Sequence, residues 1–192
     1  MENTVKKARF GTYDIVFIGV MSAVVFAANF LSIPLGDVTR IHFGNVFCVL
    51  SGLLLGPVSG GLCAGLGSFF YDLCNPLYAA EAPITFLMKF VLGGVAGLIS
   101  HLGGRKGKAL PFNLAGAVAG SLSYVALYLA KNFVTQYFLL KNPIDTVWAL
   151  LITKGTVSLL NAVIAVVVAV LICPVFHQVL ERSGFAGKLS AR

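Results

Sequence analysis

The sequence predicts an all-α integral membrane protein, built as a bundle of six transmembrane helices. Its 192 residues are 58% hydrophobic and only 11% charged, whereas soluble domains carry about 25% charged residues. The apolar residues form runs close to the ~20 residues that a helix needs to cross a bilayer. No Ser-rich or low-complexity linker divides these runs, so residues 1–192 are expected to form one membrane domain.

Turn-forming residues separate the six apolar runs. The segment SIPLGDVTR follows the first run, Gly56-Pro57 separates the second from the third, and Asn75-Pro76 ends the third. Pro83 suits the first turn of the fourth helix, and KNPID precedes the last run. The predicted helices cover about Tyr13–Leu31, Ile41–Leu55, Pro57–Cys74, Pro83–Ser100, Leu114–Leu139 and Thr146–Val179.

Basic residues predict the orientation of the bundle. The net charge of +7 is concentrated in clusters between the apolar runs, where cytoplasmic loops carry their Lys and Arg. We therefore expect an N-in/C-in, multi-pass protein of the cell membrane, with cytoplasmic segments at residues 1–12 and 180–192. The clusters lack the interleaved aromatic residues of nucleic-acid surfaces, so no nucleic-acid partner is predicted. They are Lys6, Lys7 and Arg9; Arg105, Lys106 and Lys108; and Arg182, Lys188 and Arg192.

Motifs for catalysis and metal binding are absent from the sequence. It contains no HExxH, no nucleophile elbow and no Walker sequence, which argues against an enzyme and against ATP hydrolysis by this chain. The cysteines form neither a CxxC pair nor a ligand spacing with His, and we expect packed thiols. No catalytic residue, cofactor or metal is predicted. The four cysteines are Cys48, Cys63, Cys74 and Cys173.

Polar side chains recur at helical spacing inside the apolar runs. Charged residues within spans usually face a cavity, where they pair with one another or with a ligand. Most of these side chains lie toward the outer half of their predicted helices, which predicts one polar pocket open to the outside. The candidate substrate-binding residues are Asn45, Tyr71, Asp72, Asn75, Glu81, Lys89, Tyr128, Lys131, Lys154 and Asn161.

The candidates have other interpretations. Lys131 and Glu81 are as well suited to an interfacial position, from which their charges reach the headgroups. The tyrosines could belong to an aromatic belt at the membrane surface. Lys89 and Lys154 lie further inside their predicted spans, so interior partners are favoured for both.

Small residues recur every four positions on the first predicted helix, at Gly19, Ala23 and Ala27. Close approach over small residues holds helices together in lipid, because no hydrophobic force acts between them there. Tight packing inside the bundle accounts for most stripes of this kind. The third and fourth predicted helices carry similar stripes at Gly60, Ala64 and Gly67 and at Gly93, Gly94 and Gly97.

One segment resembles a known family. LSGLLLGPVSGGLCAGLGSFFYDL, Leu50 to Leu73, is similar to the GP-centred helix pair of the substrate-binding S components of energy-coupling factor (ECF) vitamin transporters, in their riboflavin, folate and pyridoxine-like branch. Ala23-x-x-x-Ala27 is similar to the alanine motif with which this family docks on its coupling subunit. With six predicted helices in 192 residues, the resemblance covers nearly the whole chain.

The resemblance implies a subunit that captures a vitamin or related heterocycle from outside. Uptake would be driven by ATP through separate chains, a transmembrane coupling subunit (T component) and two ATPase subunits. Gly19, Ala23 and Ala27 would then form a flat docking surface for a helix of the coupling subunit. Bacterial S components of this kind lie in the plasma membrane, which is the location that the resemblance implies.

The identity of the ligand stays open at this point. Three lysines against two acids suit a ligand with an anionic or carbonyl-rich group, and Tyr71, Tyr78, Tyr124 and Tyr128 suit a flat ring. A flavin, a pyridoxine-like compound, a pyrimidine precursor or another heterocycle would each satisfy these conditions. The competing hypothesis is a self-sufficient ion-coupled secondary transporter or a small channel, in which the same charges would carry a proton or ion.

Overall fold

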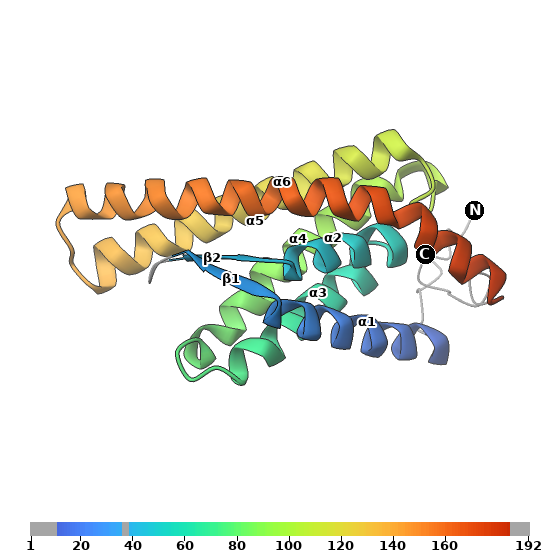
Figure 1. The fold of residues 1–192 in the computed structure, drawn as a ribbon, viewed down its shortest axis with the longest axis horizontal. Helices are drawn as coiled ribbons and strands as arrows, with labels where there is room; N and C mark the ends of the chain where they lie inside the picture. The colour runs from blue at the N-terminus through green and yellow to red at the C-terminus, as the bar shows by residue number, and fades with distance from the viewer. Residues whose placement is uncertain (1–10, 36–38, 185–192) are drawn as a thin grey trace, which may run out of the picture.

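The computed structural model describes residues 11–35 and 39–184, which form a helical bundle with one β-hairpin between its first two helices (Figure 1). All six predicted helices are present. In chain order the elements are α1 (Thr12–Phe30), β1 (Ser32–Leu35), β2 (Thr39–His42), α2 (Gly44–Leu55), α3 (Pro57–Leu73), the 3₁₀ turn η1 (Ala79–Glu81), α4 (Ala82–Ser100), the 3₁₀ turn η2 (Leu102–Gly104), α5 (Leu110–Val134), the π-helical turn η3 (Thr135–Leu139) and α6 (Ile144–Arg182).

Not every helix has the length of a membrane span. Within the described residues, four helical segments are long and apolar enough to cross a membrane, namely Thr12–Phe30, Ala79–Ser100, Leu110–Leu139 and Ile144–Arg182. By contrast, α2 has 12 residues and α3 has 17. The predicted cytoplasmic segments, residues 1–12 and 180–192, lie largely outside the described residues, and with them Lys6, Lys7, Arg9, Lys188 and Arg192.

The connection between α1 and α2 differs from the prediction. SIPLGDVTR was expected to be a turn-rich linker followed by a helix from about Ile41. Instead, β1 and β2 pair antiparallel, with Ser32 opposite His42 and Ile33 opposite Ile41. The pairing continues beyond the strands, because the Phe43 amide donates to the Leu31 carbonyl at 3.2 Å. Ile41 and His42 therefore belong to a strand; residues 36–38 of the linker lie outside the described part.

Helix α2 forms the centre of the bundle. It packs against all five other helices, and Leu50, Leu53 and Leu54 in it are fully buried. A helix that is hydrophobic all round is a buried helix, and α2 faces protein rather than lipid. Its short length is therefore compatible with a position inside a membrane bundle. Its first turn, which contains Asn45, is buried inside the fold.

Glycines let α2, α3 and α4 approach closely. Gly56, between α2 and α3, has a φ of +83°, a conformation that side chains disfavour, and Pro57 begins α3. A Cβ atom at Gly93 would lie 2.7 Å from the carbonyl oxygen of Gly60. One at Gly97 would lie 2.5 Å from the carbonyl carbon of Gly56. Internal packing therefore explains the small-residue stripes of α3 and α4.

The stripe on α1 has a different environment. Gly19, Ala23 and Ala27 are all exposed on the outside of the bundle. A Cβ atom at Gly19 would meet no other atom within 4 Å. Internal packing, the general explanation for such stripes, does not apply to these three residues.

The two ends of the bundle differ. We call the end with the hairpin, the α3–α4 connection and the α5–α6 connection the hairpin end. The opposite, terminal end holds the α2–α3 and α4–α5 connections, the first residues of α1 and the last residues of α6. In Figure 1 the α5–α6 pair extends past the other helices at the hairpin end, consistent with the 39 residues of α6 against 19 each in α1 and α4.

Candidate ligand-binding site

A buried lysine lies in the interior near the hairpin end. The side chain of Lys89, in the second turn of α4, is 3% exposed. Its ammonium group donates a hydrogen bond to the Asn45 side-chain oxygen, which the first turn of α2 holds in the middle of the bundle. The same nitrogen lies 4.2 Å from the centre of the Tyr124 ring in α5, a cation–π distance. Three helices thus converge on one desolvated charge.

No carboxylate neutralises Lys89 directly. Within the described residues the ion pairs are Lys108–Glu181 and Lys131–Glu81, so Lys89 has no acidic oxygen within 4.0 Å. Asp72, at the end of α3, is the acid in electrostatic range and lies beside the Thr85 hydroxyl. A buried charge without an ion-pair partner is expensive in a membrane protein and marks a functional position.

A second polar group lies nearer to the surface at the same end. Lys131 and Glu81 form an ion pair of 2.5 Å, with side-chain exposures of 16% and 43%. Lys154 of α6 donates to the Asn132 side-chain oxygen at 2.6 Å. Glu81 and Lys131 are the charges in electrostatic range of Lys154, so these residues form one shallow cluster.

Two stacked tyrosines connect the deep and shallow groups. The rings of Tyr124 and Tyr128, one turn apart on α5, have centroids 6.0 Å apart and are inclined by 19°. Tyr124 faces Lys89, whereas Tyr128 lies in electrostatic range of Glu81. The site thus combines aromatic surface with ammonium and amide groups at two depths.

Asn161 fastens the hairpin to the last helix. Its side-chain oxygen accepts a hydrogen bond of 3.2 Å from the backbone amide of His42, at the end of β2. Asn161 is buried, with 6% exposure. This hydrogen bond holds the end of β2 against α6. Asn161 therefore positions the hairpin backbone, in addition to belonging to the polar stripe of α6.

Comparison with known families decides what kind of protein this is. The profile of the family described as "ECF-type riboflavin transporter, S component" matches residues 9–178. The chain belongs to that family. It is therefore the substrate-binding S component of an ECF transporter and not an enzyme, as the sequence predicted. The same result goes against the hypothesis of a self-sufficient secondary transporter or channel.

Two individual proteins are similar to this S component. The solved structure titled "Structure and mechanism of the S component of a bacterial ECF transporter" has a TM-score of 0.53 and 16% sequence identity, over 88% of this chain and 95% of the other. A curated relative from Pyrococcus woesei, "Uncharacterized protein in gap 3'region", is 29% identical over 102 residues, which are 51% of this chain and 68% of the relative. The structural likeness shows the fold alone.

Tyr71 and Asn75 lie at the edge of the S component's polar site. The Tyr71 ring contacts Phe30 edge-on, with centroids 5.0 Å apart, at the end of α1. The Asn75 side-chain oxygen accepts from the Leu77 amide at 3.1 Å and thus shapes the α3–α4 connection. Neither contact involves Lys89 or the shallow cluster.

Two members of the site are missing from the ten candidates, Tyr124 and Asn132. Both are buried, and both lie at multiples of four residues from Tyr128, on one face of α5. That spacing was a usable signal for Asn132. The prediction named the charged residue beside it, Lys131, which is only half-buried.

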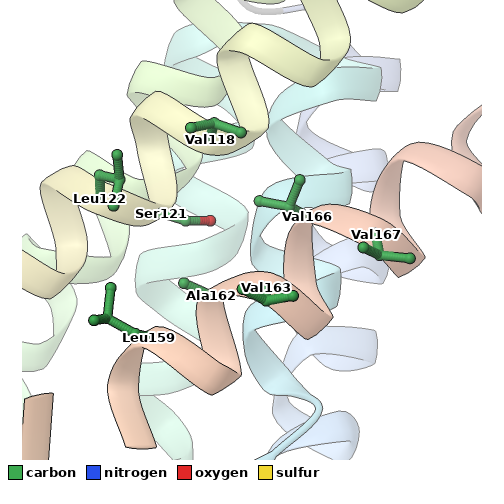
Figure 2. A pocket seen from close by; sticks show the side chains of 8 residues that line it. All are labelled: Val118, Ser121, Leu122, Leu159, Ala162, Val163, Val166 and Val167. Carbon is green, nitrogen blue, oxygen red and sulfur yellow. The ribbon is translucent and has the colours of Figure 1, made fainter. Parts of the chain in front are cut away.

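An apolar groove between α5 and α6 is a poor candidate for the ligand site of the S component. Figure 2 shows its lining side chains, all hydrophobic except Ser121. Its volume is about 170 Å³, and five of its lining residues are more than a third exposed. A groove without charge on the outer side of the bundle suits apolar surroundings rather than a polar vitamin. The lining residues are Val118, Ser121, Leu122, Leu159, Ala162, Val163, Val166 and Val167.

Metal binding has no support in the S component. In the described ranges no group of three His, Cys, Asp or Glu side chains could hold an ion. None of the four cysteines forms a disulfide in the described part of the chain; Cys48, Cys63 and Cys173 are buried, as expected for packing, and Cys74 is exposed.

Proposed function

We propose that this S component captures a flat, carbonyl-rich heterocycle at the hairpin end, and that riboflavin is the first ligand to test. The observation that carries the proposal is the buried Lys89 ammonium, held by Asn45 against the stacked tyrosines. The family description names riboflavin, and a flavin ring offers both an aromatic face and carbonyl acceptors.

The chemistry of the site fits such a ligand. An ammonium group has three donors, and Lys89 directs one of them to Asn45, which leaves donors for a ligand carbonyl. The Tyr124 and Tyr128 rings supply a surface on which a flat ring stacks. The site has more basic than acidic side chains: Lys89, Lys131 and Lys154 against Asp72 and Glu81. It therefore favours a ligand that carries negative charge or strong carbonyl dipoles.

We assign different roles to the ten candidates. Lys89, Asn45, Tyr128 and Lys154 contact the ligand. Asp72, Glu81 and Lys131 set the charge balance of the entrance. Asn161 holds the hairpin over the site, and Tyr71 and Asn75 shape its rim through the contacts described above.

The proposed orientation is N-in/C-in with all six helices within the membrane and the hairpin end outside. In support, the α4–α5 connection, which carries Arg105, Lys106 and Lys108, lies at the terminal end with the start of α1 and the end of α6 (Figure 1), as expected from the positive-inside rule. A reporter fused at residue 106 should be cytoplasmic, and one inserted near Pro143 should be external. The reverse result would turn the ligand site toward the cytoplasm.

The proposed partners are a transmembrane coupling subunit and two ATPase subunits. The exposed stripe of Gly19, Ala23 and Ala27 offers a surface on which another helix backbone can approach closely. Ala23→Trp should abolish assembly with the coupling subunit and ATP-driven uptake, while ligand affinity of the isolated S component stays unchanged. Leu171→Trp adds the same bulk at a position on α6 that is 70% exposed, and should leave assembly intact. Equal loss in both variants would contradict docking on α1.

Ligand identity is tested by titration. Riboflavin should lose its fluorescence on binding to the purified S component, because stacking on tyrosine quenches flavins. Pyridoxine and a uracil derivative serve as competitors of the other ligand classes. If either competitor displaces riboflavin at lower concentration, that class is the ligand; if none binds, the proposed site chemistry is wrong.

A further inference from the structure

One exposed apolar face follows α6 over almost its whole length. It begins at Ile144 and Trp148 at the hairpin end and ends at Val175 and Val179 at the terminal end, with exposures of 37% or more throughout. The intervening members of this face are Ile152, Leu159, Val163, Val167 and Leu171. Between Asp145 and Glu181 the sequence of α6 has one charged residue, Lys154, and its ammonium points to Asn132.

Polar groups on this face are satisfied without water. Thr153 donates to the Ala149 carbonyl at 3.0 Å, and Thr156 donates to the Ile152 carbonyl at 2.9 Å. Both threonines are exposed. Polar groups in contact with lipid must find their partners within the protein, so the face is suited to lipid up to and beyond the level of Lys154.

The face is longer than the membrane core. At 1.5 Å per residue, the axis from Trp148 to Val175 is about 40 Å long, whereas the hydrocarbon core is ~30 Å thick. A helix with excess apolar length tilts in the bilayer. An upright α6 would instead raise its first turns, together with the end of α5, into water.

The end of the α5–α6 hairpin carries an aromatic patch. We call this patch the hairpin tip; it consists of Tyr137, Phe138, Leu139, Leu140, Ile144 and Trp148, all exposed. The Phe133 ring packs against this patch: its centroid lies 5.6 Å from that of Tyr137 and 6.4 Å from that of Trp148. An exposed apolar patch of this kind marks an interaction surface, and Trp and Tyr are the residues enriched at membrane interfaces.

We propose that the hairpin tip is a membrane anchor: α5 and α6 cross the bilayer at a tilt, and the tip lies among the headgroups and upper acyl chains of the leaflet at the hairpin end. The proposal rests on the unbroken continuity between the tip and the lipid-facing side of α6. Lipid, rather than a second protein, is the occupant because the patch is an extension of a surface that lipid already covers. The anchor is independent of the ligand and of the coupling subunit.

The chain provides its own probe, since Trp148 is the only tryptophan. The full-length protein is reconstituted in phosphatidylcholine vesicles whose acyl chains carry bromine at a shallow or at a deep position. The shallow bromine should quench Trp148 more than the deep one does. Iodide in the buffer should quench Trp148 far less than it quenches free N-acetyltryptophanamide.

A control calibrates the depth. In the double variant Trp148→Phe/Val163→Trp, the tryptophan lies at the middle of the exposed face of α6, and the deep bromine should be the better quencher. Quenching of Trp148 by iodide to the level of the free amide, without bromine quenching, would place the tip in water and overturn the anchor. Protection from both quenchers would show that a protein surface covers the tip, and would overturn it as well.

Discussion

The deep and shallow halves of the polar site use the same residue types in different ways. Lys89 and Asn45 are each 3% exposed, and among the described residues the Lys89 ammonium has no carboxylate within 4.0 Å. Lys131, in contrast, is paired with Glu81, whose side chain is 43% exposed. The comparison shows that two lysines at the same end of the bundle differ in burial and in whether a carboxylate neutralises them.

Energetics explain the difference. An exposed ion pair contributes about 0–1 kcal/mol, because water screens it and because two long side chains lose freedom. A hydrogen bond to a desolvated charge contributes about 1.5–3 kcal/mol. For the proposed site we therefore expect a ligand to gain most from the deep group, and the shallow pairs to affect mainly the charge around it.

The largest effect is expected for Lys89→Met, which keeps an apolar chain and removes the ammonium. Ligand affinity should fall about a hundredfold, as expected for the loss of about 3 kcal/mol at a buried charged hydrogen bond. Without ligand, the variant should be as stable as the parent or more stable, since a buried charge costs free energy. Ligand titration and thermal unfolding of the same sample measure both quantities. A lower Tm with unchanged affinity in the folded fraction would make Lys89 structural.

Lys154→Ala should have an intermediate effect. It removes the donor that contacts Asn132 at 2.6 Å in the half-buried shallow cluster. We expect a loss of affinity of about tenfold, which corresponds to about 1.4 kcal/mol. Asn132→Ala is the matched variant, because it removes the partner and leaves the ammonium. If Asn132→Ala lowers affinity as much as Lys154→Ala does, the hydrogen bond between the two residues supports the shape of the site. Direct contact of Lys154 with the ligand would then be contradicted.

Glu81→Gln should have the smallest effect of the three. Its ion pair with Lys131 is partly exposed, so the free energy of unfolding should change by less than about 1 kcal/mol. Affinity for a neutral ligand should stay within about threefold of the parent value, again less than about 1 kcal/mol. An anionic ligand should bind more tightly, because the change removes a negative charge from the entrance. Parallel titrations with riboflavin and riboflavin phosphate distinguish the two cases. A large loss of affinity for both ligands would show that Glu81 contacts the ligand directly, as proposed for the deep group.

The sequence predicted the parts of this fold that depend on local signals. The lengths of the apolar runs and the turn-forming pairs Gly56-Pro57 and Asn75-Pro76 predicted the ends of all six helices to within a few residues. Charge inside an apolar run predicted interior partners for Lys89 and Lys154; Lys89 is buried against Asn45, whereas Lys154 is half-buried beside Asn132. Their stripes did lie near one end of the bundle.

Features that depend on long-range packing could not be predicted. The pairing of β1 with β2 joins residues up to ten positions apart, Ser32 with His42, and the turn-forming residues of SIPLGDVTR did not indicate it. Tyr71 shares a helical face with Asp72, yet its ring reaches Phe30 on α1 rather than Lys89. Small residues also recur at helical spacing on both α1 and α3. Only the fold distinguishes the exposed Ala23 from the packed Gly60.

The hydrogen bond between His42 and Asn161 has a consequence for biosynthesis. It joins residues 119 positions apart, so the ribosome must complete most of the chain before the hairpin can be fastened. Lys154, Asn161 and the rest of α6 are also the last transmembrane part to leave the insertion machinery. An intermediate that lacks α6 would have the glycine-packed α2–α4 core but would lack Lys154 and the hydrogen bond that holds the hairpin. For the proposed site, ligand binding would therefore report that synthesis and insertion of α6 have finished.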